Sequence, residues 1–294
     1  MGMKRELLGA DGLVLEVSGH PGPPPLRFES ADGGRLLLRQ GERPVLLARL
    51  QGGSCCRDLF LHRLGGFRPL LPPPRSAAMR SPVDWLHQYT RWLEGTADGP
   101  LDDGRWHLAR RTAFAPGIWT EDLVREWPGG QLELLCGGGW HGVVPLRPLS
   151  APDAPRVRAY RKHARDGTLA PVLLWWVSFL DGWLILDGHD RAVAAGAEGM
   201  NPPCVVLARA LPDEKWRRLA DGMTAGHEQH MARLAALPDG PGIARQRAAL
   251  ERGFGDAVAE VSHDHDFTRR WPLPGGPAAW DALADEVMFE CRSD

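Results

Sequence analysis

The chain has 294 residues, of which 43% are hydrophobic and 24% are charged, and its formal net charge is −2. This composition predicts a globular protein that is long enough for more than one domain and buries a sizeable core. The near-neutral charge argues against a general nucleic-acid-binding protein, although it allows a local basic patch. The five cysteines include no C-x-x-C pair, so the sequence indicates neither a disulfide framework nor a structural zinc site.

Two features of the chain bear on its location. No uninterrupted apolar run approaches the ~20 residues that a membrane span needs. Only a few apolar residues follow the basic amino terminus, which does not match the apolar segment of a signal peptide. We therefore expect no membrane partner and a cytoplasmic location.

Residues 1–71 alternate short apolar runs with turns, as at 13–17, 35–39 and 45–50. The pattern predicts a β-rich amino-terminal region of about four antiparallel strands. Its role is left open between a structural one and contact with a partner.

A polyproline-like linker at residues 71–74 marks the first predicted boundary. Residues 72–141 read as a mixed helical region. Ser81, followed by proline, predicts the start of a helix that runs to about Glu94. The glycine run at 137–139 is too weak a pattern for a phosphate loop, and a connecting turn is the simpler interpretation.

Residues 142–210 carry the central predicted unit, and a helix over 154–165 lies early in it. Asp153 is the expected cap of this helix, and Gly167 follows its end. Its cationic side chains are Arg156, Arg158, Arg161, Lys162 and Arg165. A solvated basic face is the simpler interpretation, and contact with phosphate is the alternative. Arg147, just before the helix, is the better candidate for a ligand contact.

The stretch from residue 171 to 195 predicts a strand pair that runs into a helix. Residues 172–177 and 183–186 are apolar, β-branched and aromatic, and the turn between them contains Asp-Gly. The small residues from 192 onward are typical of a helix packed close to a sheet, with Gly199 as a plausible end. A polar cluster at 187–191 therefore lies where a strand leads into a helix.

The first turn of a helix has unpaired backbone N–H groups and the positive end of the helix dipole, so it stabilises an anion. Gly188 would let a phosphate approach the backbone, and Arg191 could offer its guanidinium. Asp187 could hold a metal or act as a base, and Asp190 could do the same or cap the helix. His189 could shuttle a proton or contact phosphate. The simpler alternative makes Asp190 a cap, Gly188 a turn residue and Arg191 a surface ion-pair partner.

The order of these elements resembles the ParB/sulfiredoxin-like fold. The resemblance rests on residues 142–147, a helix, residues 167–172, the strand pair and the motif L-D-G-H-D-R-x-x-A-A at 186–195, and it covers about 142–208. It is nearest to the D-G-H-H-R version of ParB-like nuclease-domain proteins and free serine kinases. It implies that Gly188, His189 and Arg191 bind phosphates of a nucleotide.

The chain also departs from this family. Sulfiredoxins carry their catalytic cysteine in this turn, where the chain has His189, so their sulfinic-acid repair is not expected. Partition-type ParB proteins have a Glu-Arg pair before the last arginine, where the chain has His189 and Asp190, which argues against their CTP switch. The second histidine of the serine kinases is also replaced by Asp190.

Residues 211–294 predict a helical carboxy-terminal lobe, with helices over about 213–237, 243–261 and 277–291. The His-Asp cluster at 263–266 could supply metal ligands, but a polar loop is the simpler interpretation. His227 and His230 receive the same interpretation. Most of the twelve tryptophans should be core anchors; a few near residue 187 could wall a ring: Trp175, Trp176 and Trp183.

Taken together, the sequence predicts an α+β fold with a β-rich amino-terminal part, a central ParB/sulfiredoxin-like unit and a helical carboxy-terminal lobe. The expected ligand is a small phosphorylated molecule, with a nucleotide first, held by Gly188, Asp190, Arg191 and Arg147. If the protein is an enzyme, the expected reaction is Mg²⁺-dependent phosphoryl transfer or hydrolysis, with Asp187 and His189 catalytic and Asp187 the metal ligand. The alternative is a non-catalytic module that binds a protein partner.

Overall fold

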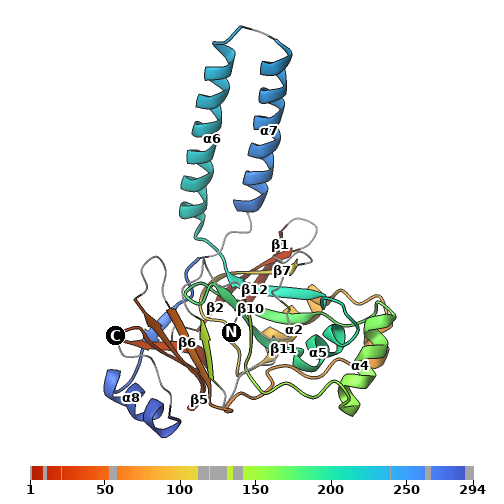
Figure 1. Ribbon diagram of the computed structural model, residues 1–294, viewed down its shortest axis with the longest axis vertical. Coiled ribbons are helices and arrows are strands. Elements are labelled where there is room, and N and C mark those ends of the chain that lie inside the picture. Colours follow the sequence, from red (N-terminus) through yellow and green to blue (C-terminus); the bar gives the residue numbers. More distant parts are fainter. Residues whose placement is uncertain are drawn as a thin grey trace. The chain divides into compact units, whose positions relative to one another are not determined.

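The structure is a computed structural model that describes residues 2–8, 12–20, 22–52, 58–111, 119, 131–134, 142–238, 240–261 and 266–288. The fold is α+β, as predicted, with strands concentrated in the amino-terminal part and helices in the carboxy-terminal part. The chain divides into two units (Figure 1): residues 1–208 with 267–294, and residues 209–266.

The first unit contains two sheets. The first sheet has the strand order β1-β2-β7-β12-β10-β11-β9, and the second has the order β13-β3-β4-β5-β6-β8. The strands of the first sheet are β1 (Gly2–Leu8), β2 (Gly12–Ser18), β7 (Gly104–Arg111), β9 (Val143–Pro145), β10 (Val172–Val177), β11 (Gly182–Asp187) and β12 (Cys204–Arg209). Those of the second are β3 (Leu26–Ala31), β4 (Arg35–Gln40), β5 (Arg43–Gln51), β6 (Asp58–Arg63), β8 (Gln131–Leu134) and β13 (Arg270–Pro272).

The amino-terminal strands are shared between the two sheets. β1 and β2 join the first sheet through the antiparallel pairing of β2 with β7, whereas β3 to β6 form consecutive antiparallel pairs in the second. The sequence predicted about four antiparallel strands in this region, whereas the structure describes six, divided between the two sheets. Alternation within each strand indicated which faces are apolar but not which strands pair.

The strand pair predicted at residues 172–186 is confirmed. β10 and β11 are antiparallel, and their other neighbours in the sheet, β12 and β9, run parallel to them. Strand alternation sends Trp175 toward the second sheet, where its ring centroid lies 5.7 Å from that of Phe28. Trp176 faces the opposite way, with its ring centroid 5.0 Å from that of Trp183. The main core of the protein is thus the apolar layer between the sheets.

The described helices of the first unit are α1 (Ser76–Met79), α2 (Trp85–Gly95), α4 (Pro155–Arg165), α5 (His189–Gly196) and α8 (Gly276–Glu286). α5 and α8 pack on the outer faces of the first and the second sheet, whereas α2 contributes Leu86, Tyr89 and Leu93 to the main core. α8 buries Trp280 against Leu37 and Phe60 of the second sheet, and the Trp280 indole N–H donates to the Leu36 carbonyl at 2.8 Å. α5 packs on β10 and beside α4. Each fully buried large apolar side chain of this kind contributes roughly 1.5–3 kcal/mol.

Two helix starts differ from the predicted ones. Asp84, not Ser81, caps α2, because its carboxylate accepts hydrogen bonds from the backbone N–H groups of Leu86 and His87. At α4 the cap position is taken by Ala154, which provides no side-chain bond, and Pro155 opens the helix. Asp153 is therefore not the cap of α4.

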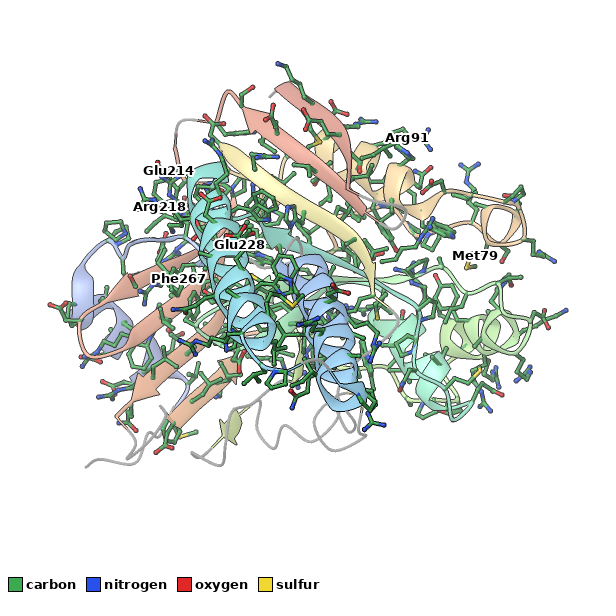
Figure 2. The ribbon with its side chains drawn as sticks, turned by 90° about the horizontal axis from the view of Figure 1, so that it is seen from above. Met79, Arg91, Glu214, Arg218, Glu228 and Phe267 are labelled. Atoms are coloured by element: carbon green, nitrogen blue, oxygen red, sulfur yellow. The ribbon has the colours of Figure 1, made fainter. Side chains whose placement is uncertain are left out.

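The second unit is a pair of long helices, α6 (Asp213–Ala235) and α7 (Pro241–Val261), which lie side by side (Figure 1). Their seam includes a stacked contact between His227 and Phe254, with ring centroids 4.3 Å apart. On the surface of α6, Glu214 and Arg218 lie one turn apart and form an ion pair (Figure 2). None of the described side chains of α6 and α7 is fully buried.

Several features of the sequence fall outside the described residues: the neighbouring cysteines 55 and 56, residues 120–127 of the mixed helical region, the glycine run 137–139 and residues 263–265 of the His-Asp cluster. Among the helices that the structure describes, none is both long and apolar enough to cross a membrane.

Candidate functional site

The polar cluster lies at the junction of β11 and α5, as the sequence predicted. Gly188 occupies the amino-terminal cap position of α5 with a φ of 97°, and no side chain caps the helix. A φ in this range favours glycine, because a Cβ atom would be strained there. An added Cβ would also lie 2.6 Å from Nη2 of Arg191. The Arg191 guanidinium therefore lies over the backbone of the turn, in space that only glycine leaves open.

Arg191 is 1% exposed, which is unusual for a charged side chain. Its Nη2 donates to Oδ2 of Asp187 at 2.5 Å and to the hydroxyl of Tyr89 at 3.2 Å. Its Nε and Nη1 atoms are buried and have no hydrogen-bond partner among the residues that the structure describes. Buried polar groups are almost always paired, so two unpartnered donor nitrogens on one buried guanidinium need an explanation.

The Tyr89 hydroxyl helps to hold this guanidinium in place through a hydrogen bond to Nη2. Tyr89 is fully buried on α2, and its hydroxyl donates to the carbonyl of Pro171 while it accepts from Arg191. Burial raises the pKa of Tyr89, although the nearby charge of Arg191 partly opposes the effect, so the hydroxyl stays protonated. Burial acts to lower the pKa of Arg191, but its proximity to Tyr89 and Asp187 outweighs this and the net pKa is raised.

His189 is buried and neutral. Its Nε2 accepts a hydrogen bond from the backbone N–H of Leu146 at 3.1 Å, which places the ring proton on Nδ1. Burial lowers its pKa well below the ordinary value, and the positive charges of Arg147, Arg63 and Arg191 lower it further. The imidazole therefore connects the end of β9 to α5 in its uncharged form.

Asp190 forms ion pairs with two arginines at the mouth of the site. Its Oδ1 accepts from Ser150 Oγ at 2.8 Å and from Arg147 Nη2 at 3.2 Å, and Oδ2 lies 3.4 Å from Arg156 Nε. The Arg147 and Arg156 side chains keep 33% and 57% of their surface exposed. Asp190 is buried and carries one negative charge. It therefore orients the two half-exposed arginines but neutralises only one of their two positive charges.

These residues surround a pocket of about 140 Å³. Among the described residues, three arginines and two aspartates line it, which leaves an excess of one positive charge. Its lining is Phe67, Pro69, Leu71, Pro73, Pro74, Arg147, Arg156, Tyr160, Leu186, Asp187, Gly188, His189, Asp190 and Arg191.

The carboxylates do not fit a metal ion held by the protein. Mg²⁺ is bound through oxygen ligands, usually one or two carboxylates with waters or phosphates. Asp187 is paired with Arg191, and Asp190 with Arg147 and Arg156. No cluster of three potential His, Cys, Asp or Glu ligands occurs among the residues that the structure describes.

All six predicted site residues line this one pocket: Arg147, Asp187, Gly188, His189, Asp190 and Arg191. The tryptophans proposed as ring walls do not line it. Residues that the site prediction missed are Tyr89, Ser150 and the wall at 67–74, and Arg156 was named only as one of five helix cations for which phosphate contact was the alternative. Each approaches the turn from a distant part of the chain, so no local pattern could reveal it.

Comparison of the chain with protein-family models, with curated proteins and with solved structures finds no match.

Proposed function

We propose that the pocket at the start of α5 binds the phosphate group of a small molecule. The observation that carries this proposal is the pair of unpartnered donors, Nε and Nη1, on the buried Arg191 guanidinium. A phosphate group carries several acceptor oxygens and can take hydrogen bonds from more than one nitrogen of a planar guanidinium, an arrangement that lysine does not offer.

Three further features support an anion rather than a cation or a neutral ligand. The uncapped amino terminus of α5 presents backbone N–H groups and a positive dipole end. The glycine at the cap lets an oxygen approach the backbone closely. Arg147 and Arg156 are fixed by Asp190 at the mouth of the pocket while still partly exposed. The site is thus organised before a ligand arrives, which reduces the ordering cost of binding.

A nucleotide is the ligand class that the resemblance to the ParB/sulfiredoxin-like fold implies. Mg²⁺-dependent phosphoryl transfer at Asp187 and His189 receives less support from the geometry. Asp187 is held by Arg191, and His189 Nε2 already accepts the Leu146 N–H. A general base needs a free acceptor within reach of the proton that it takes. The contacts therefore favour binding over acid–base chemistry.

A thermal-shift titration tests the proposal. Inorganic phosphate, ATP, CTP, GTP and their diphosphates, each with and without Mg²⁺, should include at least one compound that raises the melting temperature by mass action. Arg156→Gln should reduce the rise without unfolding the protein, because Arg156 is largely exposed.

Arg158→Gln is the matched control, since Arg158 is an exposed cation on the same helix that does not line the pocket. An equal loss in both variants would point to non-specific electrostatics. If neither phosphate nor any nucleotide raises the melting temperature of the folded wild-type protein, the proposal fails.

A protein-interaction module is the second candidate, and α6 is the element that favours it. Trp216 and Leu219 are 38% and 44% exposed on this helix. Exposed large apolar side chains close together are typical of contact surfaces. Sedimentation of the full chain and of the double variant Trp216→Ser, Leu219→Ser tests whether this surface drives self-association. A monomeric profile for both proteins would count against self-association through α6.

A further inference from the structure

The pocket has a second wall that differs in chemistry from the charged turn. It is formed by residues 67–74, which lie between β6 and α1 and of which the sequence indicated 71–74 only as a linker. The side chains that it contributes to the pocket are apolar: Phe67, Pro69, Leu71, Pro73 and Pro74. Leu186 and Tyr160 also line the pocket, and the Tyr160 hydroxyl accepts from Arg156 at 3.5 Å.

This apolar wall is held in place before any ligand binds. The buried side chain of Gln40 forms two hydrogen bonds with the backbone of Arg68. It donates to the carbonyl at 3.0 Å and accepts from the N–H at 2.8 Å. Phe67 is buried, with its ring centroid 6.0 Å from that of His189. Proline has a fixed φ and resists local rearrangement. The distance between the wall and the turn is therefore set by the fold.

The wall also limits the hydrogen bonds that a ligand can make. Proline has no backbone N–H, and the side chains of Phe67 and Leu71 carry no polar atom. A hydroxyl group pressed against these side chains loses its water without gaining a side-chain partner, which is unfavourable. An aromatic or aliphatic group gains from the same contact.

The size of the pocket adds a second restriction. Its volume of about 140 Å³ lies below the range of roughly 300–1,000 Å³ that is typical of pockets for drug-sized ligands. It has room for a phosphate and a compact group attached to it. A ribose and a base would have to extend beyond it.

From these observations we infer that the site selects a compact phosphate monoester whose organic group is aromatic or aliphatic, in preference to a sugar phosphate or a nucleotide. This inference rests on the proposed phosphate site and narrows its ligand class. The charged turn would hold the phosphate, and the wall at 67–74 would discriminate between the groups attached to it.

Calorimetric titration with four probes tests the inference: inorganic phosphate, phenyl phosphate, ribose 5-phosphate and AMP. Phenyl phosphate should bind at least about tenfold more tightly than ribose 5-phosphate, since each unpaired buried hydroxyl costs the equivalent of one power of ten or more. Ribose 5-phosphate or AMP binding as tightly as phenyl phosphate would overturn the inference and leave the proposed phosphate site standing. If no probe binds, both fail.

Two proline variants test whether the wall causes the difference in affinity between phenyl phosphate and ribose 5-phosphate. Pro73→Ser places a hydroxyl in the wall and should lower the ratio of phenyl phosphate to ribose 5-phosphate affinity several-fold. Pro72→Ser changes the neighbouring exposed proline, which does not line the pocket, and should leave the ratio unchanged. An equal ratio in the two variants would show that the wall does not select the ligand.

Discussion

The guanidinium of Arg191 lies against the backbone of Gly188, at a distance where a Cβ on residue 188 would come within 2.6 Å of Nη2. The two residues depend on each other: the glycine makes room for the arginine, and the arginine places two unpaired donors beside the start of α5. This relationship turns an ordinary strand-to-helix junction into a candidate anion site. It also makes the junction testable by substitutions that change little else.

Gly188→Ala should lower the free energy of unfolding by about 1–3 kcal/mol, because the alanine would be strained at a φ of 97° and would displace Arg191. Urea unfolding measures the change. Gly196→Ala, at the last residue of the same helix and in open space, should be neutral or stabilising by up to about 1 kcal/mol. Equal losses in the two variants would contradict the packing of Arg191 over Gly188.

Asp187→Asn should destabilise the protein, because it leaves the buried Arg191 cation without its counter-charge. Removing one partner of a buried ion pair costs about 3–5 kcal/mol, and we expect the lower end because Asp187 keeps some solvent exposure. Asp153→Asn, at an exposed carboxylate before α4, should change stability by less than ~0.5 kcal/mol. A neutral Asp187→Asn variant would show that this carboxylate is not needed for the fold and would revive its catalytic interpretation.

Stability should fall as the pH drops below about 6.5, the pKa of histidine in an unfolded chain. Burial lowers the pKa of His189 and also that of His163 in the folded protein. Protonation therefore favours the unfolded chain, and stability is lost from about pH 6.5 down toward the folded pKa values, by at most about 1.4 kcal/mol per pH unit for each proton.

The measurement is urea unfolding between pH 7.5 and pH 5 in the wild type and in His189→Gln, whose decline should be shallower. His87→Gln, on the exposed surface of α2, controls for the loss of a histidine as such and should retain the wild-type slope. The same slope in all three proteins would argue against a neutral buried His189.

Removal of the α6–α7 pair should leave phosphate binding intact. Every residue that lines the pocket belongs to the first unit. The ends of the second unit lie next to each other, since the N–H of Asp266 donates to the carbonyl of Arg209 at 2.9 Å. A variant in which residues 213–264 are replaced by a short Gly-Ser linker should therefore show the thermal shift of the full chain with the same ligand. Loss of the shift from a folded variant would assign the helices a part in the site.

The predictable part of this fold is the local part. The apolar runs of β10 and β11 and the small residues of α5 determine their own conformations, so the strand pair and the following turn could be located from composition and spacing. Five of the six predicted site residues lie at that turn and follow from the same reasoning, whereas Arg147 was chosen for its place just before the helix over 154–165. The long apolar periodicity of α6 and α7 likewise sufficed for their prediction.

The rest depends on contacts between distant parts of the chain. Tyr89 and Arg191 are 102 residues apart in the sequence and form a hydrogen bond. The buried side chain of Gln40 binds the backbone of Arg68 in the wall, and no sequence pattern indicates this pairing. β1 and β2 read like the strands beside them but pair in the other sheet, because short alternating strands carry no signal for their partner. The proline-rich segment predicted as a linker forms a pocket wall because of its contacts with distant residues, which its own sequence does not indicate.

The most direct test of the central claim is nuclear magnetic resonance of the arginine Nε–H groups during a titration with inorganic phosphate. The Arg191 resonance should be identified by its loss in Arg191→Lys and should shift as phosphate occupies the pocket, while the resonance of the exposed Arg158 stays in place at constant ionic strength. An Arg191 resonance that does not move at phosphate concentrations that saturate the thermal shift would contradict the account, because the unpaired donors over Gly188 would then not be where the anion binds.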